Sequence, residues 1–259
     1  MLRRYSWDAL YERELQNHAD DDEDEGTIWF DESNAEETVL QELDKLAAEG
    51  LLSKSSSTFL DLGTGNGHML FALREPADDD DDDDEDSGAA GPWRGDMVGV
   101  DYSAPSIDLA HRIAAQRHER DDALAATPSL GELRLETWDL LVDTPGPWLP
   151  TTGTFDVVLD KGTFDAISLM SGDWHPCAIY RYKVLPLIKA GGFLVVTSCN
   201  WTRDELAELI LPGALAPIGN GRDGRDGGWL ELFREAKYPS FSFGGKSGQS
   251  VVTLIFRRG

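Results

Sequence analysis

A short apolar segment runs directly into three alternating glycines in residues 58–68, whose sequence is Thr-Phe-Leu-Asp-Leu-Gly-Thr-Gly-Asn-Gly-His. The apolar part predicts a strand that ends beside an acid, and the residues after the glycines predict the start of a helix. Glycine allows a sharp backbone turn and lets a ligand lie against the main chain without interference from a Cβ atom. The segment therefore indicates an α/β protein that holds a nucleotide-type cofactor on a strand, a turn and a helix.

The spacing of the glycines and a neighbouring carboxylate distinguish between cofactors. The turn consists of Gly63, Thr64, Gly65, Asn66 and Gly67. A dinucleotide-binding turn has the pattern Gly-x-Gly-x-x-Gly, so the third glycine comes one position early here. Asp61 would repel a pyrophosphate but suits a cation. Because S-adenosylmethionine carries a sulfonium and an amino group but no phosphate, the turn favours this cofactor over a nicotinamide dinucleotide.

The formal net charge of the chain is −25, and much of it comes from two acidic runs at residues 20–25 and 78–86. Outside these runs the chain is still acidic, and no basic stripe is visible. Phosphate groups would be repelled, so nucleic acid is not expected as the main partner. The acidity is compatible with a basic protein substrate that is attracted electrostatically, and equally with a role in solubility alone.

The 259 residues suffice for one large domain or two small ones. The two cysteines, Cys177 and Cys199, and the five scattered histidines show no metal-ligand spacing, so no metal site is expected. This cysteine usage fits a reducing, intracellular setting, and we expect a cytoplasmic monomer, with the nucleus as a second location. The N-terminus lacks an apolar signal core, and no apolar run is long enough to span a membrane, so no membrane partner is expected.

Apolar segments alternate with helical patterns along the chain and predict a doubly wound parallel sheet. The expected parallel strands are residues 58–62, 97–101, 133–137, 155–160 and 192–198. Residues 238–243 and 250–257 predict a closing antiparallel hairpin. The expected fold class is therefore α/β, a Rossmann-like seven-stranded sheet of the methyltransferase type, mostly parallel with a C-terminal antiparallel hairpin.

Helical patterns cover residues 7–17, 33–50, 178–189 and 202–210, and the third of them continues across Pro186. The second and the fourth begin with capping boxes. Residues 1–50 are expected to form an N-terminal helical lid or extension packed on a catalytic domain of residues 51–259. An acidic insertion at about residues 76–92 is expected to be a disordered surface loop, and residues 219–228 a flexible loop.

Four acids lie at or just after the ends of predicted strands, at the edge of the sheet where open α/β proteins bind their ligands. Asp61 would lie near the amino acid portion of the cofactor, and Asp101 would accept hydrogen bonds from both ribose hydroxyls. Asp139 would meet the adenine amino group, with Leu140 against the ring. Asp160 would face the methyl donor and the incoming nucleophile.

Each of these acids also has a structural interpretation. An acid after a strand is often only a helix cap, and Asp101, which precedes Tyr102 and Ser103, fits that description. Asp160 could pair with Lys161. Four acids at corresponding strand ends are nevertheless harder to explain as caps than as one binding edge.

Several segments together resemble a known family. They are residues 7–15, 26–31, 59–67, 100–103, 159–168, 198–202 and 241–246. With them the chain resembles the class I, or seven-strand, methyltransferases. More narrowly it is similar to the protein-lysine methyltransferases that modify translation elongation factor 1-alpha, particularly their fungal branch. The narrower marker is the sequence Asp-Lys-Gly-Thr-Phe-Asp at residues 160–165.

The resemblance implies an S-adenosylmethionine-dependent protein-lysine N-methyltransferase whose partner is a basic protein, elongation factor 1-alpha. It gives Trp29 and Phe30 weight as lid residues over the cofactor, although adjacent aromatics are more often core residues. The expected cofactor-binding residues are Trp29, Phe30, Asp61, Gly63, Thr64, Gly65, Asn66, Gly67, Asp101, Tyr102, Asp139, Leu140 and Asp160.

Asp160 is the candidate catalytic residue, which would orient the lysine amine. Asn200 and Trp201 follow the fifth strand and are candidates for the lysine channel because of that position. No Asn-Pro-Pro-aromatic motif stands at the fourth strand, which argues against an enzyme that methylates nucleobase amino groups. The alternatives are a methyltransferase of the same fold for a small molecule or RNA, a non-catalytic binding module, and an NAD-dependent oxidoreductase.

Overall fold

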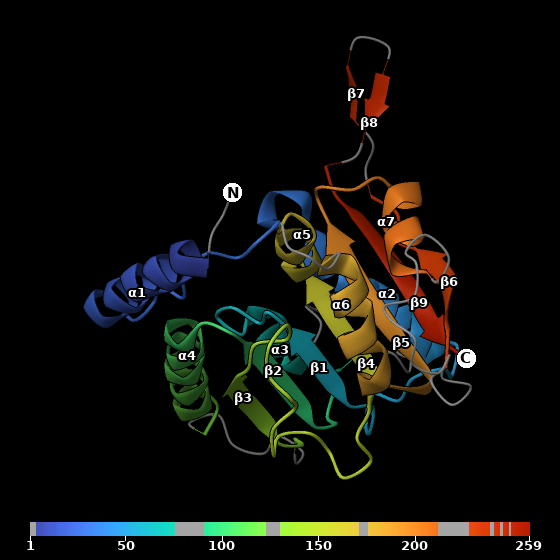
Figure 1. The fold of residues 1–259 in the computed structure, drawn as a ribbon. Coiled ribbons are helices and arrows are strands. Elements are labelled where there is room, and N and C mark those ends of the chain that lie inside the picture. Colours follow the sequence, from blue (N-terminus) through green and yellow to red (C-terminus); the bar gives the residue numbers. More distant parts are fainter. Residues whose placement is uncertain are drawn as a thin grey trace, which may run out of the picture. The chain divides into compact units, whose positions relative to one another are not determined.

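The computed structural model describes residues 4–75, 91–122, 130–170, 176–211, 228–238, 241–243, 246–248 and 250–259. Its main sheet has seven strands in the order β3-β2-β1-β4-β5-β9-β6, with the elements labelled in Figure 1. The chain divides into two compact units. The glycine-turn unit comprises Leu2–Ile28 and Leu40–Trp138, and the Asp160 unit comprises Trp29–Val39 and Asp139–Gly259.

The glycine-turn unit contains three parallel strands, β1 (Phe59–Leu62), β2 (Met97–Asp101) and β3 (Leu133–Thr137). Leu62 lies opposite Val100, and Asp101 lies opposite Thr137, so the carboxyl ends of the strands meet at one edge. Every residue of β1 and β2 is buried, which explains why both strands are mostly apolar apart from Asp61 and Asp101. The first three predicted strands are confirmed.

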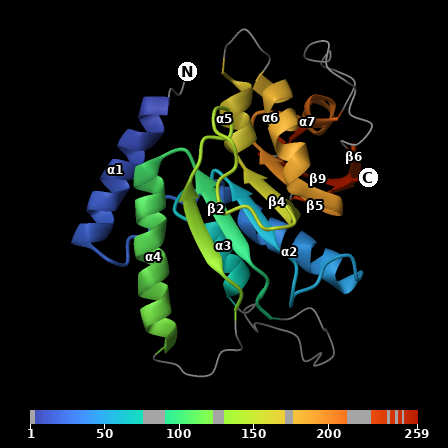
Figure 2. The ribbon, with the colours of Figure 1, turned by 60° about the horizontal axis from the view of Figure 1, so that its bottom comes forward.

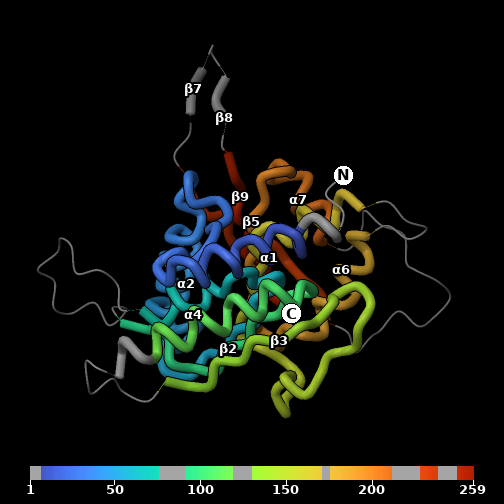
Figure 3. The backbone as a smooth tube through the Cα atoms, turned by 90° about the vertical axis from the view of Figure 1, so that its left-hand side faces the viewer, coloured from blue at the N-terminus to red at the C-terminus, as the bar shows by residue number. Residues whose placement is uncertain are grey.

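Three helices belong entirely to the glycine-turn unit: α1 (Arg4–Asp20), α3 (His68–Arg74) and α4 (Ala104–Asp122). Helix α1 lies along α4, as Figures 2 and 3 show from two directions. Tyr11 of α1 joins Phe71, Leu109 and Ile113 in a buried apolar cluster. The amphipathic helix predicted near the N-terminus is therefore confirmed, and its apolar side packs inward.

The Asp160 unit contains four strands of the main sheet. Strands β4 (Phe155–Lys161) and β5 (Ile188–Ser198) are parallel, and β9 (Val252–Arg258) runs antiparallel to β5. Figure 1 shows β5 between β4 and β9. The next strand is β6 (Leu230–Glu235), which pairs antiparallel with β9. The fourth and fifth predicted parallel strands are thereby confirmed as β4 and β5.

Antiparallel strands at the C-terminus were predicted, but the pairing differs from the expected hairpin. Strand β9 pairs with β5 and β6. The segment expected to pair with it instead contributes β7 (Phe241–Phe243), which pairs with β8 (Lys246–Gly248) in a separate two-stranded sheet. Strand β6 escaped prediction because only its first residue is buried and charges interrupt its apolar residues.

The remaining helices include two departures from expectation. Their bounds are η1 (Asp31–Ser33), α2 (Ala35–Ala48), α5 (Thr163–Ser168), α6 (Pro176–Val184), η2 (Leu185–Leu187) and α7 (Arg203–Ile210). The helix expected to cross Pro186 ends at Val184 instead, because proline lacks the N–H that the next turn needs. Helix α2 begins two residues after the expected cap at Ser33, because η1 occupies that position.

The second expected capping box is confirmed at Thr202 and Glu205, where each side chain bonds the backbone N–H of the other residue. The acidic run at residues 78–86 lies outside the described residues, as do residues 219–227 of the expected flexible loop. Among the helices that the structure describes, none combines the length and apolarity needed to cross a membrane.

Candidate functional site

The backbone conformation at the three alternating glycine positions of the turn is one that favours glycine. Gly63, Gly65 and Gly67 have φ angles of 66°, 60° and 84°, in the left-handed region. A Cβ atom on Gly65 would also lie 2.6 Å from the hydroxyl oxygen of Tyr11, and one on Gly67 would lie 2.9 Å from Phe71. Helices α1 and α3 therefore press on the turn so closely that a side chain at either position would clash.

Asp101 ties this turn to the end of β2. Its carboxylate accepts hydrogen bonds from the backbone N–H of Gly65 at 3.2 Å and of Ser103 at 2.9 Å. Ser106 donates to the carbonyl oxygen of Gly65 at 2.7 Å. Asp101 is 8% exposed, and burial raises the pKa of its carboxyl, although these hydrogen bonds oppose the shift. Helix α4 begins at Ala104, three residues further on, so these hydrogen bonds fix the turn between β2 and α4 and are not a helix cap.

Asp101 still has capacity for a ligand. A carboxylate has about four lone-pair sites, so the ribose role stays a prediction beside the two hydrogen bonds to the backbone. Asp61 lies buried on β1, and Tyr102 follows Asp101 half-buried.

Two hydroxyl oxygens near the turn suit a polar ligand. Thr64 Oγ1 and Ser103 Oγ are buried and have no hydrogen-bond partner within the described part of the chain. A buried polar atom without a partner costs about 1–3 kcal/mol, so binding of a polar group that reaches it is favoured. The turn and its surroundings therefore fit a polar cofactor.

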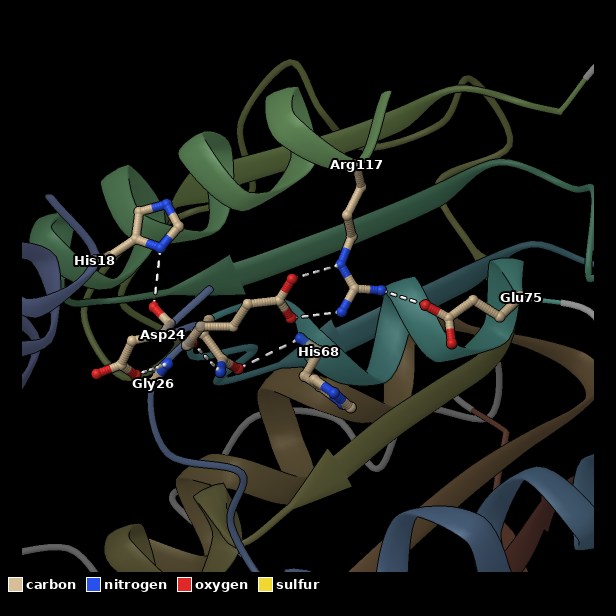
Figure 4. Close-up of polar contacts among 8 residues, drawn as sticks. His18, Asp24, Gly26, His68, Glu75 and Arg117 are labelled. Carbon is tan, nitrogen blue, oxygen red and sulfur yellow. Dashed lines mark hydrogen bonds and ion pairs between the residues drawn. The ribbon is translucent and has the colours of Figure 1, made fainter. Parts of the chain in front are cut away.

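Asn66 lies in the turn, but its side chain bonds within the protein. Its Nδ2 donates to the carbonyl oxygen of Glu25 at 2.8 Å, and its Oδ1 accepts from the backbone N–H of His68 at 3.3 Å. Figure 4 shows this region, including His68 at the start of α3. Asn66 thus connects the turn with the acidic segment that follows α1.

Asp160 lies at the end of β4, as predicted, and is 2% exposed. Both of its carboxylate oxygens accept from the backbone N–H of Phe164 at 3.0 Å, and Oδ2 accepts from the hydroxyl of Tyr180 at 2.8 Å. Burial, together with the negative charge of Asp160, raises the pKa of Tyr180 well above its ordinary value, so this tyrosine stays a proton donor. The carboxylate is held rigidly between α5 and α6.

Trp29 and Phe30 lie next to the end of β4, far from it in sequence. Lys161 Nζ donates to the carbonyl oxygen of Trp29 at 2.8 Å. The ring of Phe30 lies 3.2 Å from where a Cβ on Gly162 would be, and Phe30 has a left-handed φ of 65°, which is rare for an aromatic residue. Phe30 also packs on a buried cluster that includes Tyr238, so it has the core role considered for it, while a lid role stays a prediction.

Asp139 lies in a tight turn after β3. Its Oδ1 accepts from the backbone N–H of Leu141 at 2.9 Å, and its own N–H donates to Asp143 Oδ2 at 3.0 Å. Leu140 is buried. The adenine-binding roles of Asp139 and Leu140 stay predictions.

Asp165 holds the segment that contains Asn200 and Trp201, the candidates for the lysine channel, a role that was not among those expected from the sequence. Its carboxylate accepts from the hydroxyl of Ser198 and from the backbone N–H of Cys199 at 2.8 Å. The same Ser198 oxygen accepts from the backbone N–H groups of Asn200 at 3.2 Å and Trp201 at 3.3 Å. Burial raises the pKa of the Asp165 carboxyl, against these hydrogen bonds.

The indole of Trp201 is held by a hydrogen bond to the end of α5. Its Nε1 donates to Ser168 Oγ at 3.0 Å, and that hydroxyl donates to the carbonyl oxygen of Asp165 at 2.9 Å. Asn200 is exposed and Trp201 is half-buried. The signal that could have identified Asp165 was present, because it is the second acid of the Asp-Lys-Gly-Thr-Phe-Asp segment at residues 160–165.

Comparisons with known proteins identify the family. Residues 53–216 match the family described as a methyltransferase domain. The chain is 33% identical over 254 residues to protein-lysine N-methyltransferase EFM4 of Saccharomyces cerevisiae, with 96% of this chain and 91% of that protein covered. It is 31% identical over 253 residues to EEF1A lysine methyltransferase 2 of Danio rerio, with 97% and 85% covered. The chain belongs to the EFM4 and EEF1A lysine methyltransferase 2 family.

Membership confirms the resemblance inferred from the sequence and makes S-adenosylmethionine the cofactor. The match spans the glycine turn and the strand-end acids, and it removes the NAD-dependent alternative. Among solved structures, a chain of the complex between the Trm112 methyltransferase activator of Haloferax volcanii and a methyltransferase has a TM-score of 0.50 at 16% identity. That comparison covers 94% of this chain and 97% of the other, and it shows a shared fold.

Proposed function

We propose that this chain transfers a methyl group from S-adenosylmethionine to a lysine side chain of translation elongation factor 1-alpha. The observation that carries the proposal is full-length similarity to a relative named as a protein-lysine N-methyltransferase, 33% over 96% of this chain. The vertebrate relatives, at 31% identity, are named as lysine methyltransferases of EEF1A. Similarity over nearly the whole chain supports a shared substrate more strongly than a match to the catalytic domain alone.

On the cofactor side, the glycine turn would hold the ligand close to the backbone, and Asp101 would accept the ribose hydroxyls through its remaining lone pairs. Asp61 would lie near the amino acid portion, Tyr102 beside the ribose, and Asp139 with Leu140 at the adenine. Residues 1–50, with Trp29 and Phe30, would form the lid. The bound cofactor supplies an activated methyl group and a good leaving group, so the protein has mainly to position and desolvate the nucleophile.

On the lysine side, Asp160 would orient the amine at the end of β4. Its two oxygens are fixed by Phe164 and Tyr180, which keeps the carboxylate in one orientation. Trp201, fixed by Ser168, would line the channel with Asn200. Burial against an aromatic surface lowers the pKa of a lysine, and water or a nearby carboxylate would accept the proton.

The charge of the chain supports a basic protein partner. A net charge of −25 favours approach of a positively charged surface and disfavours RNA. We propose that the protein acts as a monomer in the cytoplasm, with the nucleus as a second location, and without a membrane or nucleic acid as main partner.

Incubation of the purified protein with methyl-labelled S-adenosylmethionine and a cell extract tests the proposal. We expect the label on a lysine of elongation factor 1-alpha, located by mass spectrometry of the labelled protein. Label on RNA or on a small molecule would replace the proposed substrate by the corresponding alternative. Asp160→Ala tests the catalytic residue, because full methyl transfer with unchanged cofactor affinity would show that Asp160 does not orient the amine.

A further inference from the structure

Residues 24–27, called the strap below, follow α1 in the chain and are held by α1 at both ends. His18 Nδ1 donates to the carbonyl oxygen of Asp24 at 2.9 Å, because a carbonyl oxygen can only accept. Thr27 donates to Glu14 Oε1 from its backbone N–H at 3.1 Å and from its hydroxyl at 2.6 Å. His18 and Glu14 are each 4% exposed. Residues 24 and 25 are the last of the acidic run at residues 20–25, described above only by its charge.

Glu25 in the middle of the strap forms a forked ion pair with Arg117 of α4. Arg117 Nε donates to Glu25 Oε1 at 3.0 Å, and a terminal guanidinium nitrogen donates to Oε2. The other side of the guanidinium contacts Glu75, and its central carbon lies 5.0 Å from the ring centroid of Phe71. Figure 4 shows Arg117 with its dashed contacts, including the one to Glu75. The Arg117 and Glu25 side chains are 24% and 21% exposed, so solvent screens this two-bond pair only partly.

The strap is bonded directly to the glycine turn. The backbone carbonyl of Glu25 accepts from Asn66 Nδ2 at 2.8 Å, and Asn66 is 6% exposed. Asn66 lies between Gly65 and Gly67, two glycines in the left-handed region. Because glycine has the largest backbone freedom of any residue, an external contact that fixes the residue between them limits the conformations of the whole turn.

We propose that Arg117 and Glu25 are positioning residues whose ion pair holds the strap on Asn66 and thereby keeps the glycine turn in the conformation that binds S-adenosylmethionine. The proposal rests on the proposed function, because it places the cofactor on this turn. A protein that populates its binding-competent conformation only in part shows an affinity reduced by that fraction. Loss of the pair should therefore weaken cofactor binding without changing the chemical step.

Two substitutions and two matched controls test this role. Glu25→Gln removes the charge but keeps the backbone carbonyl, and Arg117→Lys keeps the charge but removes the fork. Glu23→Gln neutralises an exposed acid of the same acidic run, and Arg112→Lys changes an exposed arginine of the same helix. The measurements are the Kd of S-adenosylmethionine by calorimetry, and KM and kcat with elongation factor 1-alpha as substrate.

We expect Glu25→Gln and Arg117→Lys to raise both the Kd and the KM for S-adenosylmethionine about tenfold, the change for one lost charge-assisted hydrogen bond. The kcat at saturating cofactor and the KM for the protein substrate should stay unchanged, and both controls should match the wild type. Added salt should raise the Kd of the wild type more than that of Glu25→Gln, since only the wild type has the pair to screen. If the ion pair only stabilised the fold, added salt would raise the Kd of S-adenosylmethionine equally in the wild type and in Glu25→Gln.

Unchanged cofactor affinity in both variants, with normal turnover by the wild type, would overturn the inference and leave the proposed function standing. A fall in kcat with unchanged cofactor Kd would overturn it as well. If the wild type does not bind S-adenosylmethionine at all, the proposed function fails and takes this inference with it.

Discussion

Gly65→Ala tests the contact between the N-terminal helix and the glycine turn. The new Cβ would lie 2.6 Å from the hydroxyl oxygen of Tyr11, and the position has a φ of +60°. Tyr11 is 4% exposed and belongs to a buried cluster with Phe71, so its ring has little room to move. The substitution therefore combines backbone strain with a steric clash.

The two contributions can be separated with a second glycine. Left-handed backbone costs a residue with a Cβ about 1–2 kcal/mol, and overpacking of a buried site adds about 1–3 kcal/mol. Gly65→Ala should thus lower the free energy of unfolding by about 2–5 kcal/mol. Gly50 has a φ of +72° with nothing within 4 Å of its Cβ position, so Gly50→Ala should show the strain alone.

Urea unfolding monitored by circular dichroism measures both values, and each kcal/mol corresponds to about 2–4 °C in Tm for a chain of this size. Tyr11→Phe completes a double-mutant cycle because it removes the hydroxyl oxygen that clashes with the new Cβ. The ring atom Cζ that remains lies 3.6 Å from the Cβ position, which is an ordinary contact distance. In the Tyr11→Phe background, Gly65→Ala should cost no more than Gly50→Ala. Equal costs at the two glycines in the wild-type background, or no coupling in the cycle, would refute the packing of α1 on the turn.

Three further substitutions probe stability. Thr202→Ala removes the capping box of α7 and should lower the free energy of unfolding by about 0.5–2 kcal/mol, measured by urea unfolding, with cofactor Kd unchanged. Tyr180→Phe leaves the buried carboxylate of Asp160 with one donor fewer and should cost about 1.5–3 kcal/mol, measured in the same way. Asp101→Asn should weaken cofactor binding in calorimetry and also change the pH dependence of stability. Burial raises the pKa of Asp101 above its ordinary 3.8, so its stabilising contribution is complete below that pH and is lost as pH rises through the folded-state pKa. The asparagine side chain of the variant cannot ionise. As pH rises from 3.8 through the folded-state pKa of Asp101, the unfolding free energy of Asp101→Asn should therefore increase relative to that of the wild type.

Each of these expectations has a clear contrary result. Loss of cofactor affinity in Thr202→Ala would mean that α7 contributes to the site. A Tyr180→Phe variant as stable as the wild type would show that the hydroxyl contributes nothing to Asp160. A stability difference between Asp101→Asn and the wild type that stays constant with pH would contradict the raised pKa.

The parallel strands could be predicted because burial on both faces leaves a strong signal in the sequence. Strands β1 and β2 are buried at every position, and their apolar runs predicted them correctly. Strand β6 carries no such signal, since charges interrupt its apolar residues and its place in the sheet depends on pairing with β9. The sequence predicts the end of α6 too late, because the helical pattern of apolar residues continues past Pro186. The helix itself ends at Val184, because proline has no backbone N–H for the next turn.

The glycine turn and the strand-end acids could likewise be located from the sequence, because spacing and local order determine them. The contacts that surround the turn and the acids could not be predicted from the sequence. Arg117 and Glu25 are 92 residues apart, and Asp165 and Ser198 are 33 apart, so only the fold brings these partners together. Hydrogen bonds that tie Asp101 and Asp160 to neighbouring backbone depend in the same way on exact side-chain direction, which sequence spacing does not determine.

The most direct test of the account is mass spectrometry of purified elongation factor 1-alpha after incubation with this protein and S-adenosylmethionine. We predict methyl groups on a lysine side chain with the wild type, and a strong reduction with Asp101→Asn at limiting cofactor that excess cofactor relieves. Unmodified elongation factor 1-alpha in the presence of a wild-type protein that binds S-adenosylmethionine would contradict the proposed substrate.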